Sequence, residues 1–312
     1  MAPAQMCERC SKMENRSISA LSLVAGVALC CSAFAQNAPS QQSVAAKDQK
    51  SAPAPAPRHN ISGTWTPENG PGGAIQAGGV AAMPNDGKPQ HELPYTPYGL
   101  ETYKSHKALE GHDAVKPAFF NDPRDKCEPL GFPRMNHYNL RMTQILQDDF
   151  KVAVMYEYDK RFRTIWTDGR EFPVLVDGGV RLGKGWGADS GHVREQRFYG
   201  FSVGRWTDDN TLVVETIGTM PEDRVWLDST GRPISDQVKV TETFHRVDQG
   251  HLEWTEMIDD PKIYTKPWIT MDKMRMILAD PHTDVMEMYC SPVEMQKYYE
   301  LYGNDASGVD NK

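Results

Sequence analysis

The sequence lacks the short motifs that carry the commonest zinc, hydrolase and calcium chemistry. Its nine histidines form no His-x-x-x-His pair, the spacing that places two zinc ligands on one helix face. No Gly-x-Ser-x-Gly nucleophile elbow occurs, and the acidic pair Asp208-Asp209 lacks calcium-loop spacing. These absences predict a protein with no metal ion and no cofactor.

The sequence also has no excess of basic residues. Its 34 Lys and Arg residues stand against 42 Asp and Glu residues, for a formal net charge of −8. The basic residues are interspersed with acids and form no cluster, whereas a nucleic acid or an anionic membrane surface requires a basic patch. We therefore expect no nucleic-acid partner.

Long hydrophobic runs are absent except for residues 18–33, near the start of the chain. This run follows Arg9, Lys12 and Arg16 and ends in Ala33-Phe34-Ala35, the small residues that a signal peptidase reads. We predict a signal peptide over residues 1–35, cleaved after Ala35, a periplasmic or secreted protein, and no stable membrane insertion. Met13 is an alternative start, and lipid attachment at the Cys30-Cys31 pair is an alternative fate.

Only two cysteines remain once this segment is removed. The sequence has six cysteines, of which Cys127 and Cys290 lie beyond the leader. An even pair in an oxidising compartment predicts a disulfide between them. The alternative, a catalytic thiol, requires an unpaired cysteine near a histidine.

Composition divides the rest of the chain into three parts. Residues 36–59 are rich in Ala, Pro, Gln and Ser and are predicted to be a disordered linker. Residues 60–303 are expected to form a single domain, and residues 304–312 a disordered tail. About 250 residues suffice for one large β domain.

From Tyr138 to Trp268 the sequence alternates apolar runs with short polar turns. β-branched and aromatic residues dominate the runs, and turns such as Asp168-Gly169 and Gln249-Gly250 separate them. The pattern predicts a mainly β fold, an antiparallel up-and-down β-barrel with a few short helices, because closure protects the edges of so large a sheet. A two-residue turn at Gln249-Gly250 would place Arg246 opposite Glu253.

Helix signals are few. Thr96-Pro97 has the residue types of an N-cap and a first helical position within residues 93–110. A second short helix is expected over residues 293–302. The segment 119–133 contains several prolines around Cys127 and is predicted to be irregular.

Several ordered blocks carry a family likeness. They are Lys126-Cys127-Glu128-Pro129 with Gly131-Phe132-Pro133-Arg134, Trp166–Arg170, Ser202–Trp206, Thr211–Val214, Asp259-Asp260-Pro261 with Tyr264–Trp268, and Tyr289-Cys290. Together they resemble an abundant family of exported bacterial proteins without a settled function. The resemblance spans nearly the whole mature chain and implies an exported compartment, but it brings no catalytic assignment. Gly63-x-Trp65 on a first strand is similar to the start of lipocalin-type (calycin) barrels.

Five residues are candidate ligand-binding groups at one end of such a barrel. A carboxylate and a guanidinium are offered by Asp168 and Arg170, which also suit a solvated hairpin turn. Trp186 lies in the glycine-rich segment 183–191, whose spacing does not suit a P-loop and which we interpret as an aromatic flap. Tyr199 could donate its hydroxyl to a ligand, or it could simply pack in the core. Arg224, paired with Asp228, could place a guanidinium at the rim, or the two could form an ordinary surface ion pair.

Three residues are candidate acid–base groups. His192 follows the glycine-rich segment, and imidazole is the side chain most often used for acid–base chemistry. Glu242 shares a strand face with Val240 and Phe244, so a carboxylate is expected inside the barrel unless the register slips by one residue. Tyr264 either donates a hydrogen bond to a substrate or packs in the core.

Two functional hypotheses follow. The first is an exported protein that binds a small, partly apolar molecule, aromatic or carboxylated, inside the barrel. The second is a cofactor-independent isomerase, lyase or hydrolase with an acid–base pair at the barrel mouth. A histidine and a buried carboxylate converging in one cavity would favour the enzyme.

Overall fold

The computed structural model describes residues 53–68, 79–80, 83–138 and 142–302. The predicted signal peptide, most of the predicted linker and the tail lie outside these residues. Within the described part of the chain, no helix has the length and apolar character needed to span a bilayer.

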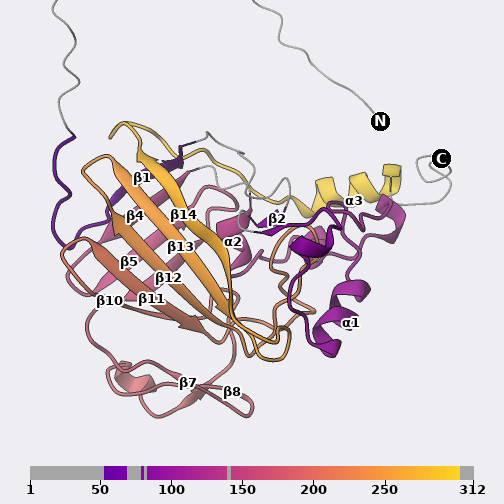
Figure 1. The fold of residues 1–312 in the computed structure, drawn as a ribbon, viewed down its shortest axis with the longest axis horizontal. Helices are drawn as coiled ribbons and strands as arrows, with labels where there is room; N and C mark the ends of the chain where they lie inside the picture. Colours follow the sequence, from indigo (N-terminus) through magenta and orange to yellow (C-terminus); the bar gives the residue numbers. More distant parts are fainter. Residues whose placement is uncertain (1–52, 69–78, 81–82, 139–141, 303–312) are drawn as a thin grey trace, which may run out of the picture. The chain divides into compact units, whose positions relative to one another are not determined.

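A single closed barrel forms the centre of the fold (Figure 1). Around the barrel the strands are β1 (Gly63–Pro67), β4 (Thr143–Gln147), β5 (Lys151–Tyr156), β6 (Phe162–Trp166), β10 (Phe201–Trp206), β11 (Thr211–Ile217), β12 (Lys239–Arg246), β13 (His251–Asp259) and β14 (Trp268–Leu278). These strands follow one another in chain order, and β14 pairs with β1 to close the ring. The structure thus confirms the predicted mainly β, up-and-down barrel.

One pair of strands in the barrel is parallel, and the odd number of strands requires it. Strands that alternate in direction around a ring must be even in number, whereas this barrel has nine. The parallel pair is β6 with β10, where Ser202 lies opposite Ile165 and Val203 opposite Trp166. We call this junction the seam. The paired residues are the last two of β6, so the first residues of both strands are not paired with each other.

The chain crosses from β6 to β10 through a small separate sheet, because a parallel pair cannot be joined by a tight turn. This sheet contains β7 (Val174–Val176), β8 (Gly179–Arg181) and β9 (Val193–Arg194), with the short helix η4 (Gly187–Asp189) between the last two. Val180 and Leu182 from this segment pack on Phe201 and Ile217 of the barrel. The predicted aromatic flap, residues 183–191, is the connection between β8 and β9 of this sheet.

The hairpin β12–β13 shows how the alternating pattern fills the barrel. Val240, Glu242, Phe244 and Arg246 are buried, whereas the residues between them are half-buried. Strand pairing places Arg246 opposite Leu252 and His245 opposite Glu253. The predicted Arg246–Glu253 pairing was therefore wrong by one residue, because the connection is longer than the assumed two-residue turn. The inward face of β12 is as the alternation predicts.

The longest strand of the barrel, β14, was not predicted. Its sequence contains Asp272, Lys273 and Arg275 among apolar residues and shows no clear alternation. A shift in register between β13 and β14 also breaks the alternation that a sequence would show. Lys273 has a positive φ of 48° in this strand.

The remaining elements are short. They are β2 (Gly79–Val80), β3 (Met83–Pro84), η1 (Pro89–His91), α1 (Pro97–Ser105), η2 (Pro117–Phe119), η3 (Pro123–Lys126), α2 (Arg134–His137) and α3 (Pro292–Tyr302). The predicted cap is present, because Thr96 Oγ1 accepts a hydrogen bond from the Gly99 backbone N–H at 2.9 Å. The α3 helix also lies where the sequence predicts one.

Two apolar clusters occupy the inside of the fold, with a polar layer between them along the strands. On β12 and β13, Phe244 and Trp254 belong to the first cluster and Val240 and Ile258 to the second. Glu242 and Glu256 lie between these pairs, and neither is accessible to solvent. The barrel interior is therefore divided by a layer of charged and polar side chains.

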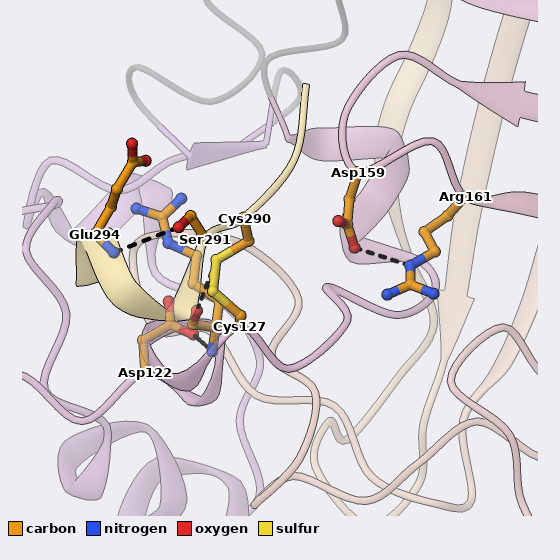
Figure 2. Close-up of a disulfide and its surroundings, with 8 residues drawn as sticks. Asp122, Cys127, Asp159, Arg161, Cys290, Ser291 and Glu294 are labelled. Atoms are coloured by element: carbon orange, nitrogen blue, oxygen red, sulfur yellow. Dashed lines mark hydrogen bonds and ion pairs between the residues drawn. A yellow bond between two sulfur atoms is a disulfide. The ribbon is translucent and has the colours of Figure 1, made fainter. Parts of the chain in front are cut away.

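The predicted disulfide is present. Cys127 and Cys290 are joined across 163 residues of sequence. Figure 2 shows that the bond ties the end of η3 to the segment just before α3, where Ser291 Oγ accepts from the Glu294 backbone N–H. The bond links the Pro-rich segment 119–133 to the C-terminal segment.

Candidate functional site

The centre of the polar layer is an ion pair between β6 and β12. Arg163 donates from Nη1 to Glu242 Oε2 at 2.7 Å and from Nη2 to Glu242 Oε1 at 3.0 Å. Both side chains are fully buried. The guanidinium also lies over the Phe132 ring, with 4.0 Å from its central carbon to the ring centroid. Burial of one charge alone would be costly, so each group requires the other.

A second carboxylate, Glu256 on β13, is satisfied by three donors. His137 Nε2 lies 2.7 Å from Glu256 Oε1, to which Thr270 also donates at 2.6 Å. Asn136 Nδ2 donates to Glu256 Oε2 at 2.6 Å and to Glu242 Oε1 at 3.0 Å. The short helix α2 therefore supplies two consecutive polar side chains to the carboxylates, and Asn136 contacts both of them.

The two carboxyl groups have opposite pKa shifts. Burial raises the pKa of Glu242 above its usual value, although Arg163 opposes this effect. Burial alone would also raise the pKa of Glu256, but the donors His137, Thr270 and Asn136 outweigh it and the pKa is lowered. The different environments make Glu242 the carboxyl of the layer that accepts a proton more readily.

A pocket of about 400 Å³ lies at the seam, where β6 and β10 are not paired with each other, and we call it the seam pocket. Arg163 contributes to its lining, so the pocket adjoins the polar layer. Four segments of chain form the lining: Pro129, Arg161, Phe162, Arg163, Thr164, Trp166, Trp186, Arg197, Phe198, Tyr199, Gly200, Phe201 and Ser202. Gly200 has a φ of +59°, and a side chain there would meet the Ile217 carbonyl oxygen.

Two residues that line the seam pocket carry a buried polar atom that the surrounding protein does not satisfy. Within the described part of the chain, the buried Tyr199 hydroxyl and the buried Arg163 Nε have no hydrogen-bond partner. Arg161 is paired with Asp159 at 2.8 Å. By contrast, no carboxylate of the described residues forms an ion pair with Arg197, and the nearby Asp189 pairs with Arg194. The Arg197 guanidinium lies over the Phe201 ring, with 4.1 Å from its central carbon to the ring centroid. The pocket therefore combines donors with aromatic surface.

Two predicted ligand-binding residues, Trp186 and Tyr199, line this pocket. Arg170 lies between two of its rings, 3.5 Å from the Trp166 centroid and 4.6 Å from the Trp186 centroid. Asp168 accepts from Arg170 Nε at 2.9 Å and Nη2 at 2.7 Å. Arg170 therefore contacts two rings of the pocket lining, and Asp168 fixes the position of its guanidinium.

Arg224 also lies next to the seam pocket, but with a partner other than the predicted one. Arg224 Nη2 donates to Glu128 Oε2 at 2.9 Å, and the guanidinium lies 5.1 Å from the Phe198 ring centroid. The predicted pairing of Arg224 with Asp228 was wrong. Asp228 is buried and lies 3.6 Å from Arg232 instead.

The three predicted acid–base residues lie in three different environments. Glu242 is in the polar layer, as the alternation indicated. Tyr264 is buried in the second apolar cluster and donates to the Pro233 carbonyl at 2.9 Å. His192 is exposed, and its Nδ1 lies 3.2 Å from the Ala188 carbonyl oxygen in the η4 turn. The histidine that contacts a buried carboxylate is His137, not His192.

Sequence reasoning missed several residues of the polar layer. Glu256 was detectable, because it alternates with Leu252, Trp254 and Ile258 on one strand face, as Glu242 does on β12. Asn136 and His137 gave no such signal, because they lie in a four-residue helix outside the strands. Arg197 also lies outside the named strands.

No protein-family model matches the chain, and a search of curated proteins finds no match. Among the residues that the structure describes, no group of three or more His, Cys, Asp and Glu side chains is placed to hold a metal ion. The function is therefore inferred from the arrangement of the site, in which a cationic and aromatic pocket lies beside a buried charged layer.

Proposed function

We propose that this protein binds a small aromatic carboxylate in the seam pocket. The observation that carries the proposal is the meeting of the Arg197 guanidinium and the unpartnered Tyr199 hydroxyl with aromatic rings in one pocket. A carboxylate accepts hydrogen bonds from both groups, and charge-assisted hydrogen bonds are the stronger kind. An aromatic ring fits against Trp186 and Phe198 with offset or edge-on geometry.

The pocket size agrees with such a ligand. A volume of about 400 Å³ lies in the range of small-molecule sites, which is about 300–1,000 Å³. The cationic lining disfavours a neutral hydrocarbon, since the buried donors would remain unsatisfied. It disfavours a cationic ligand more strongly, because the Arg197 guanidinium in the lining forms no ion pair with a described carboxylate, whereas Arg161 and Arg163 are paired.

Isothermal titration calorimetry with benzoate and its uncharged analogue benzyl alcohol tests the proposal. Benzoate is expected to bind and benzyl alcohol to bind at least about tenfold more weakly, because only the carboxylate satisfies the donors. Tyr199→Phe, which removes only the hydroxyl, and Arg197→Met are each expected to weaken benzoate about tenfold. Arg205→Met, an exposed arginine on β10, is the matched control. Absence of benzoate binding, or unchanged affinity in both variants, would contradict the proposal.

One observation favours a second candidate, the cofactor-independent acid–base enzyme. His137 and Glu256 form a buried pair at 2.7 Å, and His137 Nδ1 has no hydrogen-bond partner within the described residues. Proton NMR of bound aromatic carboxylates in D₂O distinguishes the candidates. A binding protein returns the ligand unchanged, whereas an acid–base enzyme exchanges a carbon-bound proton or forms a product. Glu256→Gln is expected to abolish such exchange.

We further infer that the protein acts outside the cytoplasm, in the periplasm or after secretion, and that it belongs with the exported proteins that its sequence blocks resemble. The Cys127–Cys290 disulfide supports this compartment, because such bonds persist in oxidising environments. Native mass spectrometry of the protein purified from its own periplasm directly tests which ligand it binds there. An added mass of an aromatic carboxylate is expected.

A further inference from the structure

A second pocket lies beside α1, apart from the seam pocket, and we call it the α1 pocket. Its volume is about 490 Å³. The segment from Pro84 to Tyr95, the α1 residues Leu100, Tyr103 and Lys104, the pair His112 and Asp113, and Arg232 contribute to its lining. It shares no residue with the seam pocket.

One wall of the α1 pocket is a supported stack of tyrosines. Tyr103 stacks on Tyr95, with centroids 5.5 Å apart and planes inclined by 15°. Tyr95 in turn stacks on Tyr264, with a centroid distance of 5.4 Å. Because Tyr264 donates to the Pro233 carbonyl and is buried, the stack rests on a fixed base. Tyr264 thus supports this wall from the core.

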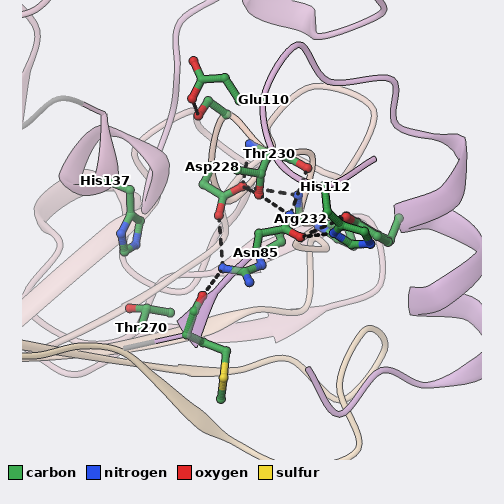
Figure 3. A network of polar contacts seen from close by, with 12 residues as sticks. Asn85, Glu110, His112, His137, Asp228, Thr230, Arg232 and Thr270 are labelled. Carbon is green, nitrogen blue, oxygen red and sulfur yellow. Dashed lines mark hydrogen bonds and ion pairs between the residues drawn. The ribbon is translucent and has the colours of Figure 1, made fainter. Parts of the chain in front are cut away.

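A chain of hydrogen bonds orients the polar side of the pocket (Figure 3). Asn85 Nδ2 donates to Thr230 Oγ1 at 2.7 Å and to the Tyr103 hydroxyl at 3.2 Å. His112 Nδ1 lies 2.6 Å from Asn85 Oδ1. Gly87 closes this side with a φ of +73°, and a side chain there would lie 3.0 Å from the His112 ring. The polar groups are therefore held in place without a ligand.

Charges around the α1 pocket are largely compensated by partners in the protein. Lys88 and His91 each lie 2.8 Å from the Asp86 carboxylate. Arg232 donates to the Met83 carbonyl at 2.7 Å and faces the buried Asp228, as Figure 3 shows. The pocket therefore does not require a charged ligand, in contrast to the seam pocket.

Two lining groups of opposite sign remain open to a ligand. Lys104 and Glu92 are exposed, and neither side chain forms a hydrogen bond or ion pair with another described residue. His91 uses Nδ1 for Asp86, which leaves Nε2 for another partner. The pocket thus offers a donor, an acceptor and an imidazole nitrogen beside a flat aromatic wall.

We propose that the α1 pocket binds an uncharged polyhydroxylated ring, such as a monosaccharide or a cyclitol. A hydroxyl group both donates and accepts hydrogen bonds, so a ring bearing several hydroxyls satisfies Lys104 and Glu92 together. The C–H face of the same ring packs on the Tyr95–Tyr103 wall. This site is independent of the seam pocket and of the ligand assigned to it.

Saturation-transfer difference NMR on the folded mature chain tests this proposal. The probes are methyl α-D-glucopyranoside and myo-inositol, with inorganic phosphate and benzoate as charged competitors. Transfer to the ring protons of at least one polyol is expected, without displacement by either anion. The Glu92→Gln and Lys104→Met variants are each expected to reduce affinity at least fivefold.

Two matched control variants test whether the polyol binds in the α1 pocket. Glu101→Gln changes an exposed acid of α1 that does not line the pocket, and Arg197→Met changes the seam pocket only. Both are expected to leave polyol binding unchanged. The proposal is overturned if the folded protein transfers saturation to neither polyol, if Glu92→Gln and Lys104→Met both bind as the parent does, or if phosphate displaces the polyol from Lys104.

Discussion

Glu242 and Glu256 lie directly opposite each other on β12 and β13, and both are buried inside the barrel. Like charges at opposed positions of a sheet are destabilising. Here each carboxylate has its own partner, Arg163 for Glu242 and His137 for Glu256. Asn136 bridges the two carboxylates, so the pair depends on residues from β6 and α2 that are distant in sequence.

The first prediction concerns this pair. Glu242→Gln removes the charge that faces Arg163 and leaves a buried guanidinium without a counter-charge. We expect the free energy of unfolding to fall by about 3–5 kcal/mol. Urea denaturation followed by tryptophan fluorescence measures the change.

The matched control for that experiment is Glu215→Gln. Glu215 forms a partly exposed ion pair with Lys239 on the neighbouring strand. Its substitution is expected to cost less than about 1 kcal/mol. Equal losses in the two variants would mean that the Arg163–Glu242 pair contributes no more than a surface pair.

The second prediction is a pH dependence that originates at Asp122. Burial alone would raise the pKa of Asp122, but Arg134 outweighs it and holds the pKa below its usual value. A carboxyl whose pKa is lowered by folding binds fewer protons in the folded state, so its contribution is complete above the unfolded pKa and is lost as the pH falls. Asp122→Asn is expected to destabilise the protein by about 3 kcal/mol near neutral pH.

The difference in the free energy of unfolding between Asp122→Asn and the parent should shrink below about pH 4, where Asp122 takes up a proton in the unfolded chain. Urea denaturation across the range from about pH 7 to about pH 3 measures it. Asp149→Asn, at an exposed turn position, is the control and should show no such trend. A difference that stays constant over this range would refute the assignment.

The third prediction concerns the disulfide. The Cys127→Ser/Cys290→Ser variant loses a link across 163 residues. A chain-entropy estimate for so long a loop is about 5 kcal/mol. Since α3 follows the linked cysteine directly, we expect limited proteolysis to release residues 292–302 before the barrel is cut. Non-reducing peptide mapping of the parent should recover the linked peptides; free thiols at both positions would contradict the structure.

The fourth prediction tests the arginine between two tryptophans. Arg170→Met removes the guanidinium from between Trp166 and Trp186 and leaves Asp168 without its partner. We expect altered tryptophan fluorescence and faster proteolysis within residues 168–197. The free energy of unfolding is expected to fall by about 1–2 kcal/mol. Arg181→Met, an exposed arginine of β8, is expected to change neither. Identical spectra for the parent and Arg170→Met would argue against the stacked arrangement.

The fifth prediction concerns export. Protein recovered from the periplasm is expected to begin at Gln36 when its N-terminus is sequenced, because Ala33 and Ala35 are small residues at the cleavage positions. Ala35→Leu should block this cleavage and leave the longer chain. A mature protein that begins with a lipidated cysteine would show that the Cys30-Cys31 pair is used instead.

Local features of the sequence were sufficient for several structural conclusions. Thr96 and Pro97 begin a helix, because the cap hydrogen bond spans three residues. The inward position of Glu242 follows from its alternation with Val240 and Phe244. The Cys127–Cys290 pairing was predicted from the expectation that only two cysteines remain once a signal peptide is removed. Each of these conclusions depends on neighbours in the chain or on a count of residues.

The candidate site was less accessible to sequence reasoning. His192 was proposed as the acid–base histidine because glycines and Trp186 precede it, yet the structure places it on an exposed turn. His137 carries no local mark of its contact with Glu256, which lies 119 residues further along the chain. The Arg224 pairing failed for the same reason, since Glu128 is 96 residues away.

By itself, the sequence determined the mainly β character of the chain, the inward face of β12 and the disulfide, because alternation and composition are properties of short segments or of counts. Only the tertiary structure decided that nine strands close the barrel with one parallel pair, that a pocket forms at this seam, and that Arg163, Asn136 and His137 meet the two carboxylates. Closure and register bring together residues such as Asn136 and Glu256, which are 120 positions apart, and no local pattern specifies which residues will meet.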